Sequence, residues 1–115
     1  MIYVQGAKNI PRSLTVFLRP AARIDQLDLA EYYDEHGGES FGELFLQRCN
    51  EGFDRLSQFP ESGTIVHCNH PKLKGCRFIL VPEFEMILIF YKAEKHQVQI
   101  VRILHGSRDI IAALD

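Results

Sequence analysis

Three short apolar segments in the second half of the chain constrain its fold most strongly. They cover residues 76–81 (CRFILV), 86–91 (MILIFY) and 98–104 (VQIVRIL). Ile, Val, Phe and Tyr are enriched in strands that are buried on at least one face, so each segment is predicted to be a strand. The polar connections over residues 82–85 and 92–97 are too short for a crossover helix, which predicts hairpin turns. We therefore expect an antiparallel meander that the preceding part of the chain must cover.

The preceding part of the chain supplies one more strand and a first helix. Residues 14–18 (LTVFL) have the β-branched and aromatic composition of a strand, and Arg19-Pro20 ends it. Proline suits the first turn of a helix, because its missing N–H would have no intrahelical partner there. Residues 21–36 are predicted to form that helix, with one apolar face and one acidic, solvated face.

A second helix is predicted after the Gly37-Gly38 pair, which favours the end of the first helix. Ser40 followed by Glu43 matches a capping box, so the second helix should begin at Ser40. Its apolar residues recur every fourth position, which predicts a buried stripe. The two helices should form a hairpin packed on the sheet. The stripe consists of Phe41, Phe45, Cys49 and Phe53.

Together these elements predict an α+β fold in one domain over residues 14–115. It has an N-terminal strand, an antiparallel two-helix hairpin on an antiparallel β-sheet (β-α-α-β-β-β), and a short C-terminal helix that begins near Ser107. A chain of 115 residues can form one core without disulfides or metal. Residues 1–13 contain Gly6 and Pro11 without a clean period, so we expect a flexible leader.

Composition favours a cytoplasmic protein with an ordinary core. No apolar run approaches the roughly 20 residues that a membrane helix needs, and residues 1–13 do not resemble a secretory signal. Cys49, Cys68 and Cys76 are odd in number and lack a framework spacing, which is typical of a reducing compartment. The net charge of −2 argues against a protein that mainly binds nucleic acid directly.

The polar stretch over residues 67–70 (HCNH), with Cys76 after it, contains residue types that zinc could use as ligands. Its spacing matches no standard zinc motif, so the favoured interpretation is a polar loop with no metal and no cofactor. A nucleophile pair of Cys68 with His70 or His105 is disfavoured, because no third residue is evident to orient the histidine.

Two arginines, Arg77 and Arg102, lie among apolar neighbours in the predicted strands. Strict alternation would place Ile100, Arg102 and Leu104 on one face of the sheet. Two interpretations stay open. One is an ion pair with a helix carboxylate such as Asp25 or Glu31. The other is a basic patch that would meet an acidic partner or nucleic acid. Its members would be Lys72, Lys74, Arg77 and Arg102.

Three aromatic residues are candidates for an interface. Helix aromatics are more often buried than exposed, so Tyr33 is predicted to belong to the core. Tyr32 is its exposed neighbour in this interpretation, and Phe84 lies in a predicted turn, which makes it the better interface candidate.

Several local motifs follow one another in a fixed order. They are FLRPAA at residues 17–22, the Tyr32-Tyr33 pair, LSQFPESG at 56–63, IFY at 89–91 and HGSR at 105–108. With the layout of elements described above, they resemble the ParE/RelE superfamily of toxins from type II toxin–antitoxin systems, in its ParE-like branch. The resemblance covers about residues 14–114.

The resemblance implies a toxin that inhibits growth by poisoning DNA gyrase without catalysing a reaction, and that a cognate ParD-like or similar antitoxin neutralises. It implies a target-binding surface in the C-terminal region at Arg102, His105 and Arg108. Antitoxin binding is expected at the helical hairpin and the sheet edge, with Tyr32 and Phe84 as candidates. The assemblies that it allows are a homodimer and a heterotetramer with the antitoxin.

Two alternatives remain beside gyrase poisoning. A RelE-like member would be a ribosome-dependent mRNA endoribonuclease, but the RelE pattern has an arginine three residues before Tyr91, where this chain has Leu88. The tyrosine that the RelE pattern has near the C-terminus is also missing, and Arg108 alone matches the remaining arginine. The other alternative is a binding module of the same fold that has no toxicity.

Overall fold

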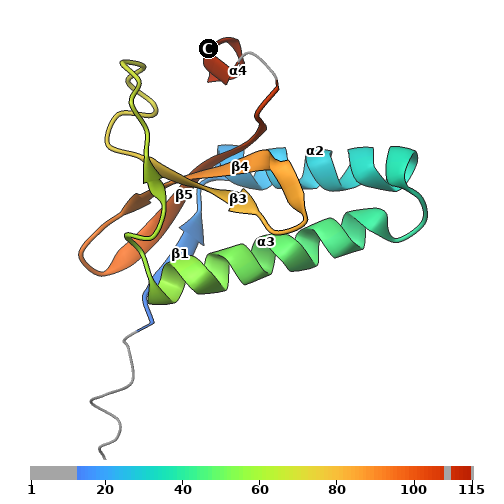
Figure 1. Cartoon of the computed structure of the whole chain (residues 1–115), viewed down its shortest axis with the longest axis horizontal. Helices are drawn as coiled ribbons and strands as arrows, with labels where there is room; N and C mark the ends of the chain where they lie inside the picture. Colours follow the sequence, from blue (N-terminus) through green and yellow to red (C-terminus); the bar gives the residue numbers. More distant parts are fainter. Residues whose placement is uncertain (1–12, 108–109, 115) are drawn as a thin grey trace, which may run out of the picture.

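The computed structural model describes residues 13–107 and 110–114, which form a five-stranded sheet with a helical hairpin and a short C-terminal helix (Figure 1). This confirms the predicted α+β fold, with one added two-residue strand. Residues 1–12 of the predicted leader and Arg108 of the predicted target surface lie outside the described residues. The elements in chain order are β1 (Thr15–Leu18), α2 (Pro20–Gly37), α3 (Phe41–Gln58), β2 (Thr64–Ile65), β3 (Arg77–Val81), β4 (Phe84–Ala93), β5 (Gln97–His105) and α4 (Ile110–Leu114).

The strands lie in the order β1-β5-β4-β3-β2. The predicted meander is present, because β3, β4 and β5 pair with their chain neighbours in antiparallel fashion. β1 pairs in parallel with β5, a geometry that needs a long connection between the two strands. The helical hairpin of α2 and α3 forms part of that connection and packs on one face of the sheet.

The helix-covered face holds the main core. Tyr33, Phe41, Phe45 and Phe84 form a ring cluster with centroids 4.8 to 5.4 Å apart. Tyr33 therefore packs on the core, as predicted. The exposed position predicted for Phe84 is wrong: the hairpin turn contains only two residues, so Phe84 begins β4 and is 6% exposed.

The capping box predicted at Ser40 is also wrong. Ser40 has a left-handed backbone (φ 66°) and makes no side-chain capping hydrogen bond. The N–H of Gly42 instead donates to Asp34 Oδ1 in α2, at 2.8 Å. A Cβ atom at Gly42 would lie 2.3 Å from the carbonyl oxygen of Ala30, so only glycine allows this close approach of the two helices.

The second face of the sheet carries a smaller core, covered by the loop over residues 66–76 and by α4. We call this the second-face cluster, and its partly buried neighbours include Val66, Phe78 and Leu104. Leu114 of α4 is 1% exposed, so the short helix is anchored by its last described residue. The buried members are Leu73, Cys76, Phe90, Val101 and Leu114.

A β-bulge in β5 overturns the strict alternation expected for this strand. Phe90 pairs with Arg102 whereas Tyr91 pairs with Ile100, so Val101 is the extra residue. Ile100 consequently packs in the main core and Leu104 on the second-face cluster. The prediction that these two residues share one face with Arg102 is wrong.

Candidate functional site

A groove of about 530 Å³ lies between α2, the end of β5 and α4. Three of the residues proposed from sequence line it: Tyr32, Arg102 and His105. Its other walls include Asp28 and Leu29 of α2. The structure thus gathers into one site residues that are far apart in the sequence.

The groove exists because β1 is shorter than β5. β1 pairs with β5 only as far as Ile100, and the N–H of Arg19 then donates to the carbonyl oxygen of Ile100 at 3.0 Å. Pro20 starts α2 immediately afterwards, which ends the strand. Beyond this point the N–H of Ile103 donates to Asp25 Oδ2 at 3.0 Å instead of to a strand.

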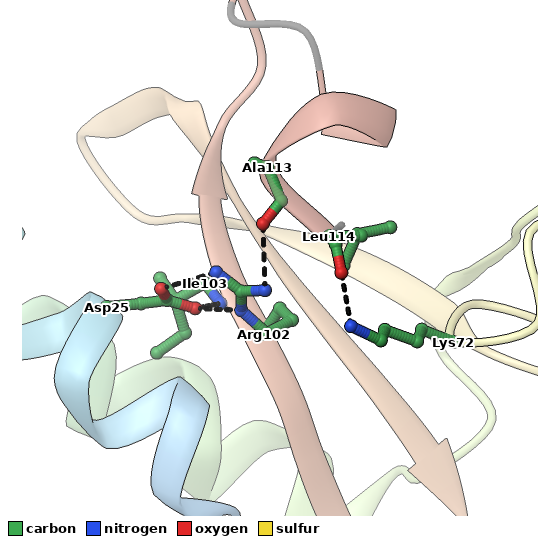
Figure 2. Close-up of polar contacts among 6 residues, drawn as sticks. All are labelled: Asp25, Lys72, Arg102, Ile103, Ala113 and Leu114. Atoms are coloured by element: carbon green, nitrogen blue, oxygen red, sulfur yellow. Dashed lines mark hydrogen bonds and ion pairs between the residues drawn. The ribbon is translucent and has the colours of Figure 1, made fainter.

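Asp25 and Arg102 form the polar centre of the site (Figure 2). The guanidinium donates from Nε to Oδ2 at 2.6 Å and from NH2 to Oδ1 at 2.9 Å, which is bidentate geometry. The side chains are 18% and 12% exposed, so the pair is largely shielded from water. The hydrogen bonds to Asp25 raise the pKa of Arg102, against the opposing effect of its partial burial. The ion-pair interpretation of Arg102 is therefore confirmed.

Arg102 also links α2 to α4. Its NH1 group donates to the carbonyl oxygen of Ala113 at 3.3 Å, and Lys72 Nζ donates to the next carbonyl, that of Leu114 (Figure 2). These two carbonyls belong to the C-terminal turn of the helix, where main-chain oxygens lack intrahelical donors. Two cations from the sheet and from the loop therefore bind the end of α4.

His105 lies at the far end of β5 and is held by the turn that follows. The N–H of Ser107 donates to His105 Nδ1 at 3.1 Å, and Ser107 Oγ lies 2.7 Å from the same nitrogen. Since Nδ1 accepts, the neutral ring carries its proton on Nε2. His105 can thus offer one N–H donor to a partner in the groove.

Tyr32 forms the outer wall of the groove on α2 and is 47% exposed. Its ring stacks on His36 with centroids 4.3 Å apart and meets Tyr33 edge-on at 5.5 Å. An exposed aromatic ring that its neighbours already hold in place suits an interface.

The predicted basic patch forms only in part. Arg77 NH1 donates to the carbonyl oxygens of Gly63 (3.0 Å) and Glu61 (3.3 Å), and Lys74 lines a separate hollow. Lys72 and Arg102 do meet, at a hollow of about 410 Å³ that we call the basic hollow. Its other two cations, Arg19 and Lys92, were missed in the sequence, because only the register of β1, β5 and β4 brings them there.

Within residues 13–107 and 110–114, no group of three or more His, Cys, Asp or Glu side chains is placed to hold a metal ion. No helix in the same residues is long and apolar enough to cross a membrane.

Cys76 and Cys49 are buried free thiols, and burial is the main cause that raises the pKa of each.

Comparison with known families now identifies the chain. The family model for the ParE toxin of type II toxin–antitoxin systems (parDE) matches residues 16–110, from β1 to the start of α4. The chain belongs to the ParE toxin family. The match includes all three groove residues proposed from sequence, and the predicted resemblance to ParE is confirmed.

A solved structure with the same fold comes from the chromosomal ParDE toxin–antitoxin system of P. aeruginosa. The TM-score is 0.66 at 17% sequence identity, and the likeness covers 82% of this chain and 97% of that chain. At this level of identity the likeness supports the ParE fold alone. A search of curated protein sequences finds no match to the chain.

Proposed function

We propose that this ParE-family chain inhibits bacterial growth by binding DNA gyrase through the groove along β5, and that a cognate antitoxin neutralises it in the cytoplasm. The observation that carries the proposal is the bidentate Asp25–Arg102 pair at the centre of the groove. The pair holds α2, β5 and α4 in a fixed arrangement, which suits a preformed protein-binding surface.

The same pair disfavours the RelE-like alternative. RNA cleavage needs cations that are free to neutralise the scissile phosphate, together with a group that transfers a proton. The guanidinium of Arg102 is already neutralised by Asp25, and Asp28 adds a further negative charge to the groove. Among the described residues that line the groove, His105 remains the obvious proton-transfer group, and its Nδ1 is engaged by Ser107.

Antitoxin binding is proposed at the exposed face of α2 and the outer edge of β5. Tyr32 belongs both to this proposed antitoxin surface and to the proposed gyrase-binding groove, since it is exposed and lines the groove. Phe84 is left out of the proposed antitoxin surface, because its ring is packed against three other rings in the main core.

A supercoiling assay with purified gyrase tests the proposal. The chain should inhibit supercoiling, and both His105→Ala and Tyr32→Ala should weaken the inhibition by about tenfold if each removes one central contact. Phe59→Ala is the matched control, because Phe59 is 55% exposed at the end of α3 and does not line the groove. Unimpaired supercoiling at high concentrations of the folded chain would contradict the proposal.

Induction of the chain alone in a bacterial host separates the three hypotheses. Filamentation with a DNA-damage response fits gyrase poisoning, rapid arrest of translation with shortened transcripts fits RNA cleavage, and normal growth fits a binding module. Co-expression of the small protein encoded next to the toxin gene should restore growth if that protein is the antitoxin.

A further inference from the structure

The basic hollow shares Arg102 with the groove, and four cations from four segments line it. Arg19 comes from the junction of β1 and α2, Lys72 from the loop, Lys92 from β4 and Arg102 from β5. Uncharged side chains complete the walls, and no carboxylate lines the hollow among the described residues. These uncharged residues are Pro20, Ala21, Pro71 and Val101.

We propose that the basic hollow is a docking site for a carboxylate side chain in an acidic, leucine-rich segment of a partner polypeptide. The proposal depends on the proposed function only in that the antitoxin is the expected source of this segment. It assigns a role to Arg19 and Lys92, which lie outside the groove.

Three of the four cations at the basic hollow have no carboxylate partner among the described residues. Arg19 Nε donates to the neutral amide of Gln99 at 2.8 Å, and Lys72 donates to a main-chain carbonyl. The ammonium group of Lys92 makes no hydrogen bond or ion pair with any residue that the structure describes, whereas its backbone pairs with Gln99 in the sheet. Within the same described residues, Arg102 is the one cation of the hollow with a carboxylate partner, Asp25. Like charges gathered around one small space favour an anion there.

Two cations of the basic hollow also act on a buried thiol, that of Cys76. Burial raises the pKa of the Cys76 thiol, while the positive charges of Lys92 and Arg19 lower it. Cys76 belongs to the second-face cluster, so these cations act on the same face of the sheet. The nearby acid Glu94 accepts hydrogen bonds from the Gln97 and Gln99 amides and does not line the hollow.

The shape of the hollow favours a carboxylate on a polypeptide over nucleic acid. Nucleic-acid backbones are bound along tracks of cations that follow successive phosphates, whereas these four cations surround one space. The apolar walls of Pro20, Pro71 and Val101 suit aliphatic side chains beside the acid. Lys72 and Arg102 each donate to a main-chain oxygen of α4 (Figure 2), and these two oxygens do not belong to the lining of the hollow.

Calorimetric titration of the full chain tests the docking site. The probes are a short capped peptide of alternating leucine and glutamate, its leucine–glutamine counterpart, and a short DNA duplex. The glutamate peptide should bind at least about tenfold more tightly than the glutamine peptide, and its affinity should fall as salt rises. Arg19→Gln and Lys92→Gln should each weaken it by at least about threefold.

Lys95→Gln is the matched control, because Lys95 is an exposed lysine between β4 and β5 that does not line the basic hollow. Lys92→Arg should restore binding, and an unchanged circular dichroism spectrum shows that each variant is folded. Equal affinity for the two peptides would overturn the inference. The inference would also be overturned if the DNA duplex bound more tightly than the glutamate peptide and if its affinity fell in Arg19→Gln and Lys92→Gln. Inhibition of gyrase is measured separately, so either proposal can fail while the other stands.

Discussion

The two faces of the sheet differ in how they are covered and in what they leave free. On the helix-covered face, two 18-residue helices enclose a core in which Phe45, Leu56 and Ile89 are fully buried. On the second face, an irregular loop and the five-residue α4 cover a smaller cluster, with the cations of the basic hollow beside it. The first face therefore supplies most of the stability, and the second is the easier one for a partner to reach.

The largest expected effect comes from emptying the main core. Phe45→Ala should lower the free energy of unfolding by about 4–5 kcal/mol, because the ring packs against Tyr33 and Phe84 between rigid elements that cannot close the cavity. Phe90→Ala is the matched change on the second face and should cost about 3 kcal/mol, because the loop can collapse onto the space. Urea denaturation measures both. Equal losses would show that the two faces are equally rigid.

The Asp25–Arg102 pair should couple the two faces measurably. A double-mutant cycle with Asp25→Ala and Arg102→Ala is expected to give a coupling free energy of about 2 kcal/mol, since the pair is bidentate and largely shielded. The Arg48–Glu51 pair in α3, in which the glutamate side chain is 55% exposed, is the control and should give less than about 0.5 kcal/mol. A coupling at Asp25–Arg102 no larger than the control would mean that the pair does not hold α2 to β5.

Two buried cysteines, one on each face of the sheet, allow the local stability of the two faces to be compared. Cys49 lies in the main core and Cys76 in the second-face cluster, and both are almost fully buried. A thiol reagent should label Cys76 at least about tenfold faster than Cys49, because opening of the loop and α4 needs less free energy than global unfolding. Cys68, which is partly exposed, should react first. Mass spectrometry of labelled peptides gives the three rates, and slower labelling of Cys76 than of Cys49 would reverse the proposed order of stability.

Local sequence patterns predicted the helices and the meander because these depend on spacing along the chain. The predictions failed where a contact from elsewhere decides the outcome. Ser40 lacks its capping bond because Asp34 of α2 reaches Gly42 instead. The bulge at Val101 reverses the faces of β5 beyond it, and no residue pattern in the strand signals such an insertion.

The sequence identified several residues of the candidate site but not how they are grouped in space. The sequence offered Asp25 or Glu31 as a partner for Arg102, and the resemblance to ParE implied a target-binding surface near His105. The structure brings Asp25, Arg102 and His105 to the groove. Arg19 and Lys92 could not be grouped from sequence, because their meeting requires the parallel register of β1 on β5 and the antiparallel register of β4 on β5. Charge clusters built across a sheet are set by topology, which composition does not reveal.

The smallest expected effect is a pH dependence that originates in the main core. Burial raises the pKa of Cys49 to about 12 from a model-peptide value of 9.0, although a hydrogen bond with Gln26 opposes the shift. The unfolded thiol ionises first, so the stability that neutral Cys49 contributes is complete below pH 9 and is lost as pH rises toward 12. At pH 10 the loss should be about 1 kcal/mol.

Urea denaturation from pH 7 to pH 10 measures this loss. Cys49→Ala should show a shallower fall in the free energy of unfolding than the wild-type chain. Cys76, whose pKa is also raised by burial, contributes equally to the wild-type chain and to Cys49→Ala, whereas Tyr33 loses in the variant one minor cause of its raised pKa, the charge of Cys49. The difference between these two slopes therefore reports the Cys49 thiol together with its smaller effect on Tyr33. Parallel curves would mean that water reaches Cys49 in the native state, and the helix-covered face would then be no tighter than the second.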